Sequence, residues 1–92
     1  MRIEWSENAV SDLESISEYI EQDRNLETAN RVTRRIFDSV ESLQTMPFRG
    51  RPGRIEGTRE LVISRLPYIV MYRVLRERVL ILNIVHGARR WP

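Results

Sequence analysis

Hydrophobic residues recur at spacings of three and four in the first part of the chain, and polar or acidic residues fill the positions between them. Because one helical turn takes 3.6 residues, this spacing predicts an amphipathic helix over residues 7–22. Ser6 is a suitable N-cap for it, and Glu7 complements the helix dipole in the first turn. The apolar stripe consists of Ala9, Leu13, Ile16 and Ile20.

A second stripe with the same spacing begins after a short break at residues 23–25. Asn25 is a suitable N-cap, so the pattern predicts a second helix that runs to about Gln44. Two helices joined by so short a link form an antiparallel hairpin, which we assign to residues 7–45. The second stripe consists of Ala29, Val32, Ile36, Val40 and Leu43.

Alternating or β-rich segments lie on both sides of the hairpin. Arg2–Trp5 alternates polar and apolar residues, which predicts a strand. Val, Ile, Leu and Tyr are frequent in residues 58–86, where we expect three antiparallel strands in a meander. Pro67 marks the bend between the first two, and Gly87 begins a basic tail at residues 87–92. The predicted strands are residues 59–64, 68–75 and 78–86.

Arginine, proline and glycine are concentrated between the hairpin and the meander. Residues 46–54 hold two Pro, two Gly and three Arg, which predicts a surface loop over residues 46–57. The order of elements is then β-α-α-β-β-β, with no repeat and no second domain. We expect residues 1–92 to form one two-layer α+β domain in which the helical hairpin packs on a small, mainly antiparallel sheet.

The predicted strand 68–75 is apolar on both of its sides. The hairpin can cover one side, but no further segment of the chain is left to cover the other. Since monomers rarely leave a contiguous apolar surface bare, this pattern predicts a partner on the second side. One side holds Tyr68, Val70, Tyr72 and Val74, and the other holds Ile69, Met71, Arg73 and Leu75.

Composition excludes several classes of protein. With 92 residues, 41% of them apolar and 30% charged, the chain has the composition of one soluble globular domain. The absence of cysteine and the single histidine exclude a disulfide framework and Cys- or His-cluster metal sites, and we expect no cofactor. No signal peptide or membrane span is recognisable, so a cytoplasmic location is expected.

Charge is distributed unevenly along the chain. Residues 1–46 carry a net charge of −5, whereas residues 47–92 carry +7. All 15 basic residues are arginine, and the guanidinium group pairs in bidentate fashion with carboxylate or phosphate. The second half of the chain is therefore suited to an acidic partner or to phosphate groups.

Several short motifs occur in a fixed order in this basic half. Together with the acidic helical hairpin, the chain resembles the RelE/ParE superfamily of type II toxin–antitoxin toxins over essentially its whole length. The fold of that superfamily, a helical hairpin against a small antiparallel sheet, agrees with the fold that periodicity predicts. The motifs are Gly50-Arg51-Pro52-Gly53, Thr58-Arg59-Glu60-Leu61-Val62, Pro67-Tyr68, Tyr72-Arg73-Val74 and His86-Gly87-Ala88-Arg89-Arg90-Trp91.

The resemblance implies a cognate antitoxin as the partner on the uncovered sheet side. Such antitoxins commonly bind through an acidic segment that bears apolar residues and folds on binding. They often carry a ribbon-helix-helix DNA-binding domain, which implies a heterotetramer or a larger complex. We expect the antitoxin or the target to contact Arg49, Arg51, Arg54, Arg59, Ile69, Met71, Arg73, Arg89, Arg90 and Trp91.

The resemblance leaves two activities open, because RelE-like toxins cleave mRNA on the ribosome and ParE-like toxins inhibit DNA gyrase. When the RelE pattern is laid on this chain, Glu60, Val62 and Ile69 stand where cations are required, and of the cations only Arg89 is kept. A phosphoryl-transfer site without its cations loses transition-state stabilisation. A ParE-like gyrase inhibitor is therefore favoured.

Some nucleases of the superfamily use Glu, Arg and His instead. Glu60, Arg65 and His86, together with Arg89, keep a metal-independent endoribonuclease open as an alternative, with His86 as acid or base and Arg65 on phosphate. The structural alternatives are that His86 bonds a backbone carbonyl and that Glu60 is a solvated strand residue or pairs with an arginine such as Arg59. A small basic nucleic-acid-binding module is the weaker third hypothesis.

Overall fold

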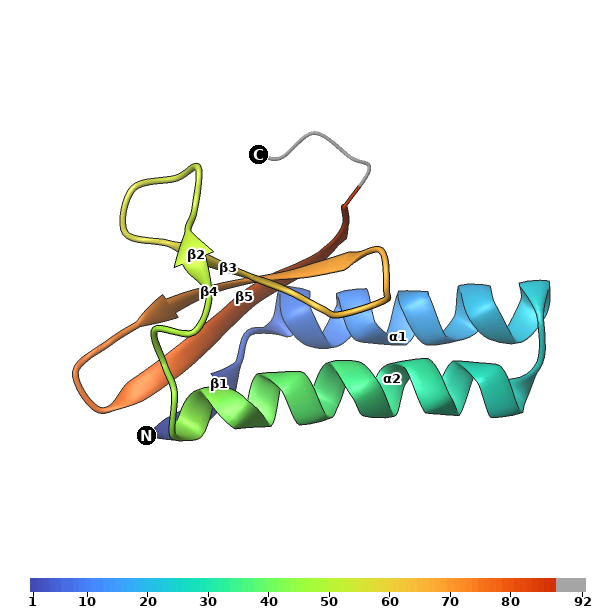
Figure 1. Ribbon diagram of the computed structural model, residues 1–92. Coiled ribbons are helices and arrows are strands. Elements are labelled where there is room, and N and C mark those ends of the chain that lie inside the picture. Colours follow the sequence, from blue (N-terminus) through green and yellow to red (C-terminus); the bar gives the residue numbers. More distant parts are fainter. Residues whose placement is uncertain (88–92) are drawn as a thin grey trace.

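Two helices lie on one side of a five-stranded sheet, which is the predicted two-layer α+β arrangement (Figure 1). The structure is a computed structural model that describes residues 1–87. Its elements are β1 (Arg2–Trp5), α1 (Glu7–Asp23), α2 (Leu26–Glu41), the 3-10 helix η1 (Ser42–Gln44), β2 (Arg51–Pro52), β3 (Arg59–Val62), β4 (Tyr68–Val74) and β5 (Arg78–His86).

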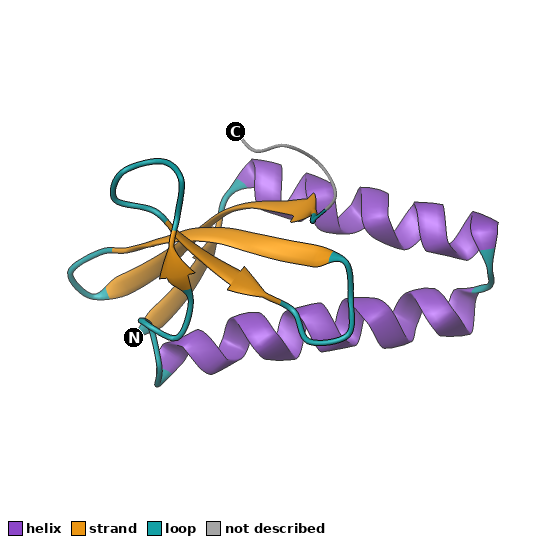
Figure 2. Ribbon diagram, turned by 45° about the horizontal axis from the view of Figure 1, so that its top comes forward, coloured by secondary structure: helices purple, strands orange, loops and turns teal. Residues whose placement is uncertain are grey.

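The strands are ordered β1-β5-β4-β3-β2 across the sheet. The meander β3-β4-β5 is antiparallel as predicted, and β1 adds a parallel edge strand whose register runs from Arg2 opposite Arg78 to Trp5 opposite Ile81. Figure 2, turned so that the sheet comes forward, shows the strands with no helix in front of them. Among the described residues, helices therefore cover only one face of the sheet.

The start of α1 is fastened to the edge of β5 that β1 leaves open. The Ser6 hydroxyl accepts the Ala9 N–H at 3.0 Å, which confirms the predicted N-cap, and donates to the Leu82 carbonyl at 2.8 Å. Six residues after Ser6, the Asp12 carboxylate accepts the Ile84 N–H at 2.8 Å. These bonds block a strand edge that would otherwise be open to another chain.

Predicted boundaries differ from the structure in three places, the first being the strand predicted over residues 59–64, which ends at Val62. The second helix, which Asn25 caps as predicted by accepting the Thr28 N–H at 2.7 Å, tightens into the 3-10 turn η1 instead of staying α-helical to Gln44. The loop predicted over residues 46–57 contains the short strand β2. Proline is tolerated in β2 because an edge strand has one side on which no ladder donor is needed.

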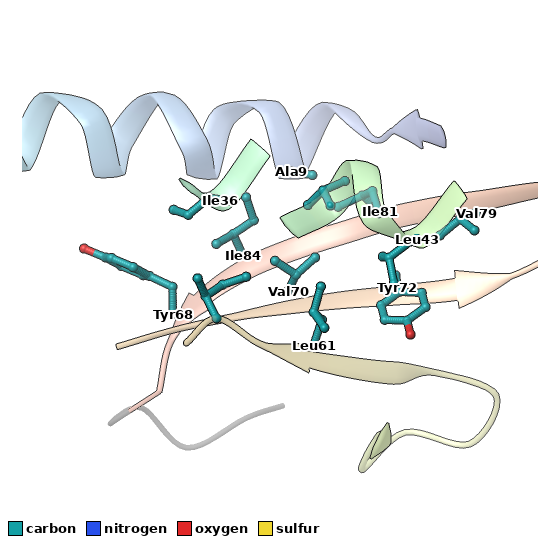
Figure 3. Packing of buried hydrophobic residues seen from close by; sticks show 12 residues of the cluster. Ala9, Ile36, Leu43, Leu61, Tyr68, Val70, Tyr72, Val79, Ile81 and Ile84 are labelled. Carbon is teal, nitrogen blue, oxygen red and sulfur yellow. The ribbon is translucent and has the colours of Figure 1, made fainter. Parts of the chain in front are cut away.

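The core fills the layer between the helices and the sheet. Figure 3 shows Val70 and Ile84 of the strands beside Ile36 of α2 in this layer. Tyr68 and Tyr72 are buried, with exposed fractions of 8% and 0%. The half-buried Trp5 packs against this core and stacks on Phe37 with ring centroids 6.3 Å apart.

The Tyr72 hydroxyl fastens the Arg/Pro/Gly loop to this core. It accepts the Gly50 N–H at 2.9 Å and donates to the Pro47 carbonyl at 2.8 Å. A Cβ at Gly50 would lie 2.7 Å from both that hydroxyl and the Glu60 carbonyl oxygen, so no larger residue fits there without a shift. The first part of the predicted surface loop is therefore held in one conformation.

We predict that Tyr72→Phe lowers the free energy of unfolding by about 1–3 kcal/mol, because it removes a buried donor and acceptor at once. Urea unfolding measures this change. The matched control is Tyr19→Phe, which removes the same hydroxyl from a side chain that is 64% exposed and should change stability by less than about 0.5 kcal/mol. Equal effects of the two substitutions would show that the Tyr72 hydroxyl does not hold the loop.

Candidate functional site

The sheet face turned away from the helices is the first candidate site. We call it the outer sheet face. Side chains alternate along a strand, so neighbours of the core residue Val70 in β4 point to this opposite face. Val62, Ile69 and Val85 stand in register across three strands and form an apolar row on it. The outer sheet face consists of Glu60, Val62, Ile69, Met71, Arg73, Leu80 and Val85.

Exposure on the outer sheet face is uneven. Val62 is 50% exposed, whereas Ile69 and Val85 are half-buried. Met71, which the sequence placed among the partner contacts, is only 1% exposed between its cross-strand neighbours Glu60 and Asn83. The surface that can receive a partner is therefore the row of Val62, Ile69 and Val85, and it is smaller than the alternation of β4 predicted.

Glu60 is held by the loop before it. Arg51 donates to Glu60 Oε1 through Nε at 3.1 Å and Nη2 at 3.0 Å, and the Arg54 N–H donates to Oε2 at 3.3 Å. Arg51 stands directly opposite Glu60 in the β2–β3 ladder, so the partner is not the sequence neighbour Arg59. The Glu60 side chain is only 5% exposed, and its carboxylate holds β2 against β3.

The remaining cations near the outer sheet face lie toward its other end. A Cβ at Gly57, whose φ is +83°, would lie 2.5 Å from Arg73 Nη1, so the β2–β3 loop passes against the half-buried Arg73 guanidinium. Arg78 donates to Glu4 Oε2 at 2.8 Å. The outer sheet face thus has its apolar row at one end and these two arginines toward the other, and the carboxylates of Glu60 and Glu4 are each already paired with an arginine.

Two arginines that were expected to contact a partner do not belong to the outer sheet face, and three other expected contact residues lie outside residues 1–87. Arg59 donates to the Phe48 and Gly50 carbonyls and lies over the Phe48 ring at 5.4 Å. Arg49 Nη1 donates to Ser42 Oγ at 2.6 Å. The tail residues Arg89, Arg90 and Trp91 lie outside the described residues 1–87.

The three described residues of the nuclease alternative do not come together. Glu60 lies on the outer sheet face, while His86 pairs in register with Tyr68, whose side chain belongs to the core on the helix side. Three residues along a strand and two strand spacings separate Glu60 from His86, which corresponds to roughly 14 Å. Arg65 is exposed in the β3–β4 turn, with φ of 65°.

A groove between the hairpin and the sheet is a site that the sequence did not predict. It has a volume of about 850 Å³, and its walls include Ile16, Tyr19, Tyr68 and His86. The Tyr68 and His86 rings meet edge to face at 5.7 Å. Burial, and secondarily Tyr19, raises the pKa of Tyr68.

The groove exists because the hairpin extends beyond the end of the sheet (Figure 1). The length of the apolar stripe in α1, which continues to Ile20, was the signal in the sequence that could have indicated it. Within residues 1–87, no three His, Asp or Glu side chains gather where they could hold a metal ion. Neither of the described helices is long and apolar enough to cross a membrane.

Comparisons with known proteins agree with this architecture. The family described as ParE toxin of type II toxin-antitoxin system, parDE, matches residues 3–91. A toxin candidate named Y4kP from Sinorhizobium fredii is 45% identical over 91 residues, 99% of this chain and 93% of that protein. Toxin RelE2 of Caulobacter vibrioides is 36% identical over 88 residues, 96% of this chain and 97% of that protein.

A solved structure has the same fold. The chain is similar, with a TM-score of 0.87 and 28% identity, to a protein of the chromosomal ParDE TA system from P. aeruginosa. The match covers 94% of this chain and 95% of that one, so it includes both the helical hairpin and the sheet.

We predict that Glu60→Gln destabilises the fold by about 1–2 kcal/mol, because it weakens charge-assisted hydrogen bonds to a buried carboxylate. In a double-mutant cycle with Arg51→Ala, we expect a coupling of about 1 kcal/mol, reduced by solvent because the Arg51 side chain is 56% exposed. Urea unfolding measures both quantities, with the exposed Glu77→Gln as control. Additive single effects would contradict the pairing.

Proposed function

We propose that this chain, which belongs to the ParE toxin family of type II toxin–antitoxin systems, inhibits DNA gyrase and is neutralised by a cognate antitoxin. The family membership rests on the match over residues 3–91 and on relatives that align with almost the whole chain. Gyrase as the target and a cognate antitoxin as the partner are proposals that go beyond this family membership.

The placement of Glu60 is the observation that supports a target other than RNA. A metal-independent ribonuclease needs an acid, a base and a cation around one phosphate. Here both Glu60 oxygens already accept hydrogen bonds from Arg51 and Arg54, and Glu60 and His86 lie on opposite sides of the sheet. Among the described residues, the nuclease alternative would therefore need a rearrangement of the β2–β3 ladder.

We assign the antitoxin to the outer sheet face. Its apolar row offers the half-exposed Val62, and Arg73 lies toward the other end of the same face, four residues along β4 from Ile69, which suits a segment with both apolar and acidic side chains. The hairpin–sheet groove is less suitable because its wall holds two carboxylates, Asp12 and Asp23, against one arginine, Arg24, and so offers an acidic segment no excess of positive charge. With an antitoxin that dimerises through a ribbon-helix-helix domain, the complex contains two copies of each chain.

A ribosome-dependent mRNA endonuclease is the second candidate. The observation in its favour is the 36% identity to a relative named Toxin RelE2. His86 would then act as acid or base, with Arg65 on phosphate, and Arg89 would be the retained cation in the tail.

We predict that the purified toxin at micromolar concentration inhibits supercoiling by gyrase and accumulates cleaved DNA, and that added antitoxin reverses both effects. A supercoiling gel measures this, with antitoxin alone as control. The contrary result is an unaffected gyrase together with cuts in translated message that toeprinting detects and that His86→Ala abolishes. That result would replace the gyrase proposal by the nuclease one.

We predict that Val62→Asp weakens antitoxin binding about 10- to 100-fold, because it introduces a charge into an apolar row that faces an acidic segment. Isothermal titration with the purified antitoxin measures the affinity. Leu26→Asp is the control, since Leu26 is 55% exposed and lies on α2, away from the outer sheet face. If the control lost affinity and Val62→Asp did not, the antitoxin would bind the helical side.

A further inference from the structure

We propose that the target protein of this toxin binds a second surface of the chain, formed by α2 and the loop after it. The target contributes an acidic patch and an apolar pocket to this contact. This proposal rests on the proposed function, because it assumes that the chain acts on a protein. We call this region the α2–loop surface. It consists of Arg31, Arg34, Arg35, Phe48 and Arg49.

The arginines of the α2–loop surface gather on one side of the helix. Arg31, Arg34 and Arg35 are spaced by three and four residues, which places them side by side along α2. With Arg49 they line a shallow hollow of about 440 Å³. The one acidic residue in its wall is Asp38, which lies 4.0 Å from Arg34. The hollow therefore carries three positive charges in excess, all on the surface.

Phe48 stands next to Arg49 in the chain and is 65% exposed. A single exposed aromatic residue needs no explanation by itself, but the backbone around Phe48 is fixed on both sides. The Tyr72 hydroxyl holds the Pro47 carbonyl at 2.8 Å, and Arg59 holds the Phe48 carbonyl at 3.1 Å. The Arg59 guanidinium also lies over the Phe48 ring, 5.4 Å from its centroid.

This rigid presentation is what indicates a docking role. A side chain that is already ordered loses little entropy when a partner covers it, so its burial contributes more fully to affinity. Exposed apolar surface continues on the same loop at Met46, which is 53% exposed. Aromatic residues and arginines are the types that contribute most to protein interfaces. Phe48 is thus a pre-ordered anchor beside a basic hollow.

The chemistry favours an acidic protein over nucleic acid as the occupant. Phosphate groups would pair with the arginines but would leave Phe48 and Met46 exposed to water. An acidic protein surface with an apolar pocket would use both parts of the α2–loop surface. The arginines would mainly raise the association rate, and Phe48 would mainly slow dissociation.

The position of this surface is also compatible with neutralisation by the antitoxin. Arg59, which holds Phe48, is followed directly by Glu60 on the outer sheet face. The two surfaces are therefore adjacent without sharing a residue. An antitoxin on the outer sheet face would exclude a large target by its bulk while leaving Phe48 out of its own interface.

The test uses Phe48→Ala and Arg35→Glu in the full chain, each with a matched control. Leu26→Ala also truncates an exposed apolar side chain, and Arg76→Glu reverses a charge in the exposed β4–β5 turn. Surface plasmon resonance measures binding to purified gyrase, isothermal titration measures antitoxin affinity, and induced expression measures growth arrest. Thermal melting checks that all four variants fold.

We expect Phe48→Ala and Arg35→Glu to weaken gyrase binding at least tenfold and to relieve growth arrest, with antitoxin affinity unchanged within about twofold. The controls should behave as wild type. If the wild-type chain did not bind gyrase but the two variants still relieved growth arrest selectively, the gyrase assignment would fail and the surface would stand.

Two results would overturn the surface itself. One is that Phe48→Ala and Arg35→Glu arrest growth as the wild type does. The other is that they lose binding to a labelled 30-base-pair DNA while gyrase binding is unchanged, which would make the arginines a phosphate site. Because antitoxin affinity is measured in parallel, a variant that merely misfolds is recognised by loss of that affinity as well.

Discussion

The buried Tyr72 hydroxyl connects the core to the loop that carries Phe48 and leads into β2. Its ring belongs to the layer between helices and sheet, while its oxygen holds both ends of the segment from Pro47 to Gly50. That segment leads directly into β2, so its fixed path sets where Arg51 meets Glu60. It also sets where Phe48 is presented. A buried polar group that is fully satisfied is costly to break, and here it determines geometry on two sides of the sheet.

One-sided packing divides the molecule into surfaces of different chemistry. The hairpin covers one face of a thin sheet, and the described part of the chain has no helix for the other face. Acidic residues lie mostly in the hairpin, and arginines lie mostly after it, apart from the cluster on α2. A toxin of this size can therefore offer an antitoxin and a target separate surfaces. A bound antitoxin could then exclude the target sterically, even though the two share no contact residues.

Local patterns predicted the elements well and the contacts poorly. The spacing of apolar residues and the caps Ser6 and Asn25 were enough for both helices. The parallel pairing of β1 with β5 was not predicted, since the two strands are separated by more than 70 residues and no local signal relates them. The burial of Met71 was missed because strand alternation predicts which face a side chain is on and not how exposed it is there. Whether Glu60 is solvated or pairs with an arginine such as Arg59 was left open, and the ladder placed Arg51 opposite it.

The sequence by itself determined the order of elements, the two-layer α+β class and the family, because periodicity, caps and short motifs are properties of neighbouring residues. Tertiary structure alone decided which side chains meet. It separated Glu60 from His86 and placed Arg49 beside the arginines of α2. It also formed a groove where the hairpin extends beyond the end of the sheet. These juxtapositions depend on strand register and on how far one layer extends past another, and neither quantity is written in the local pattern of the chain.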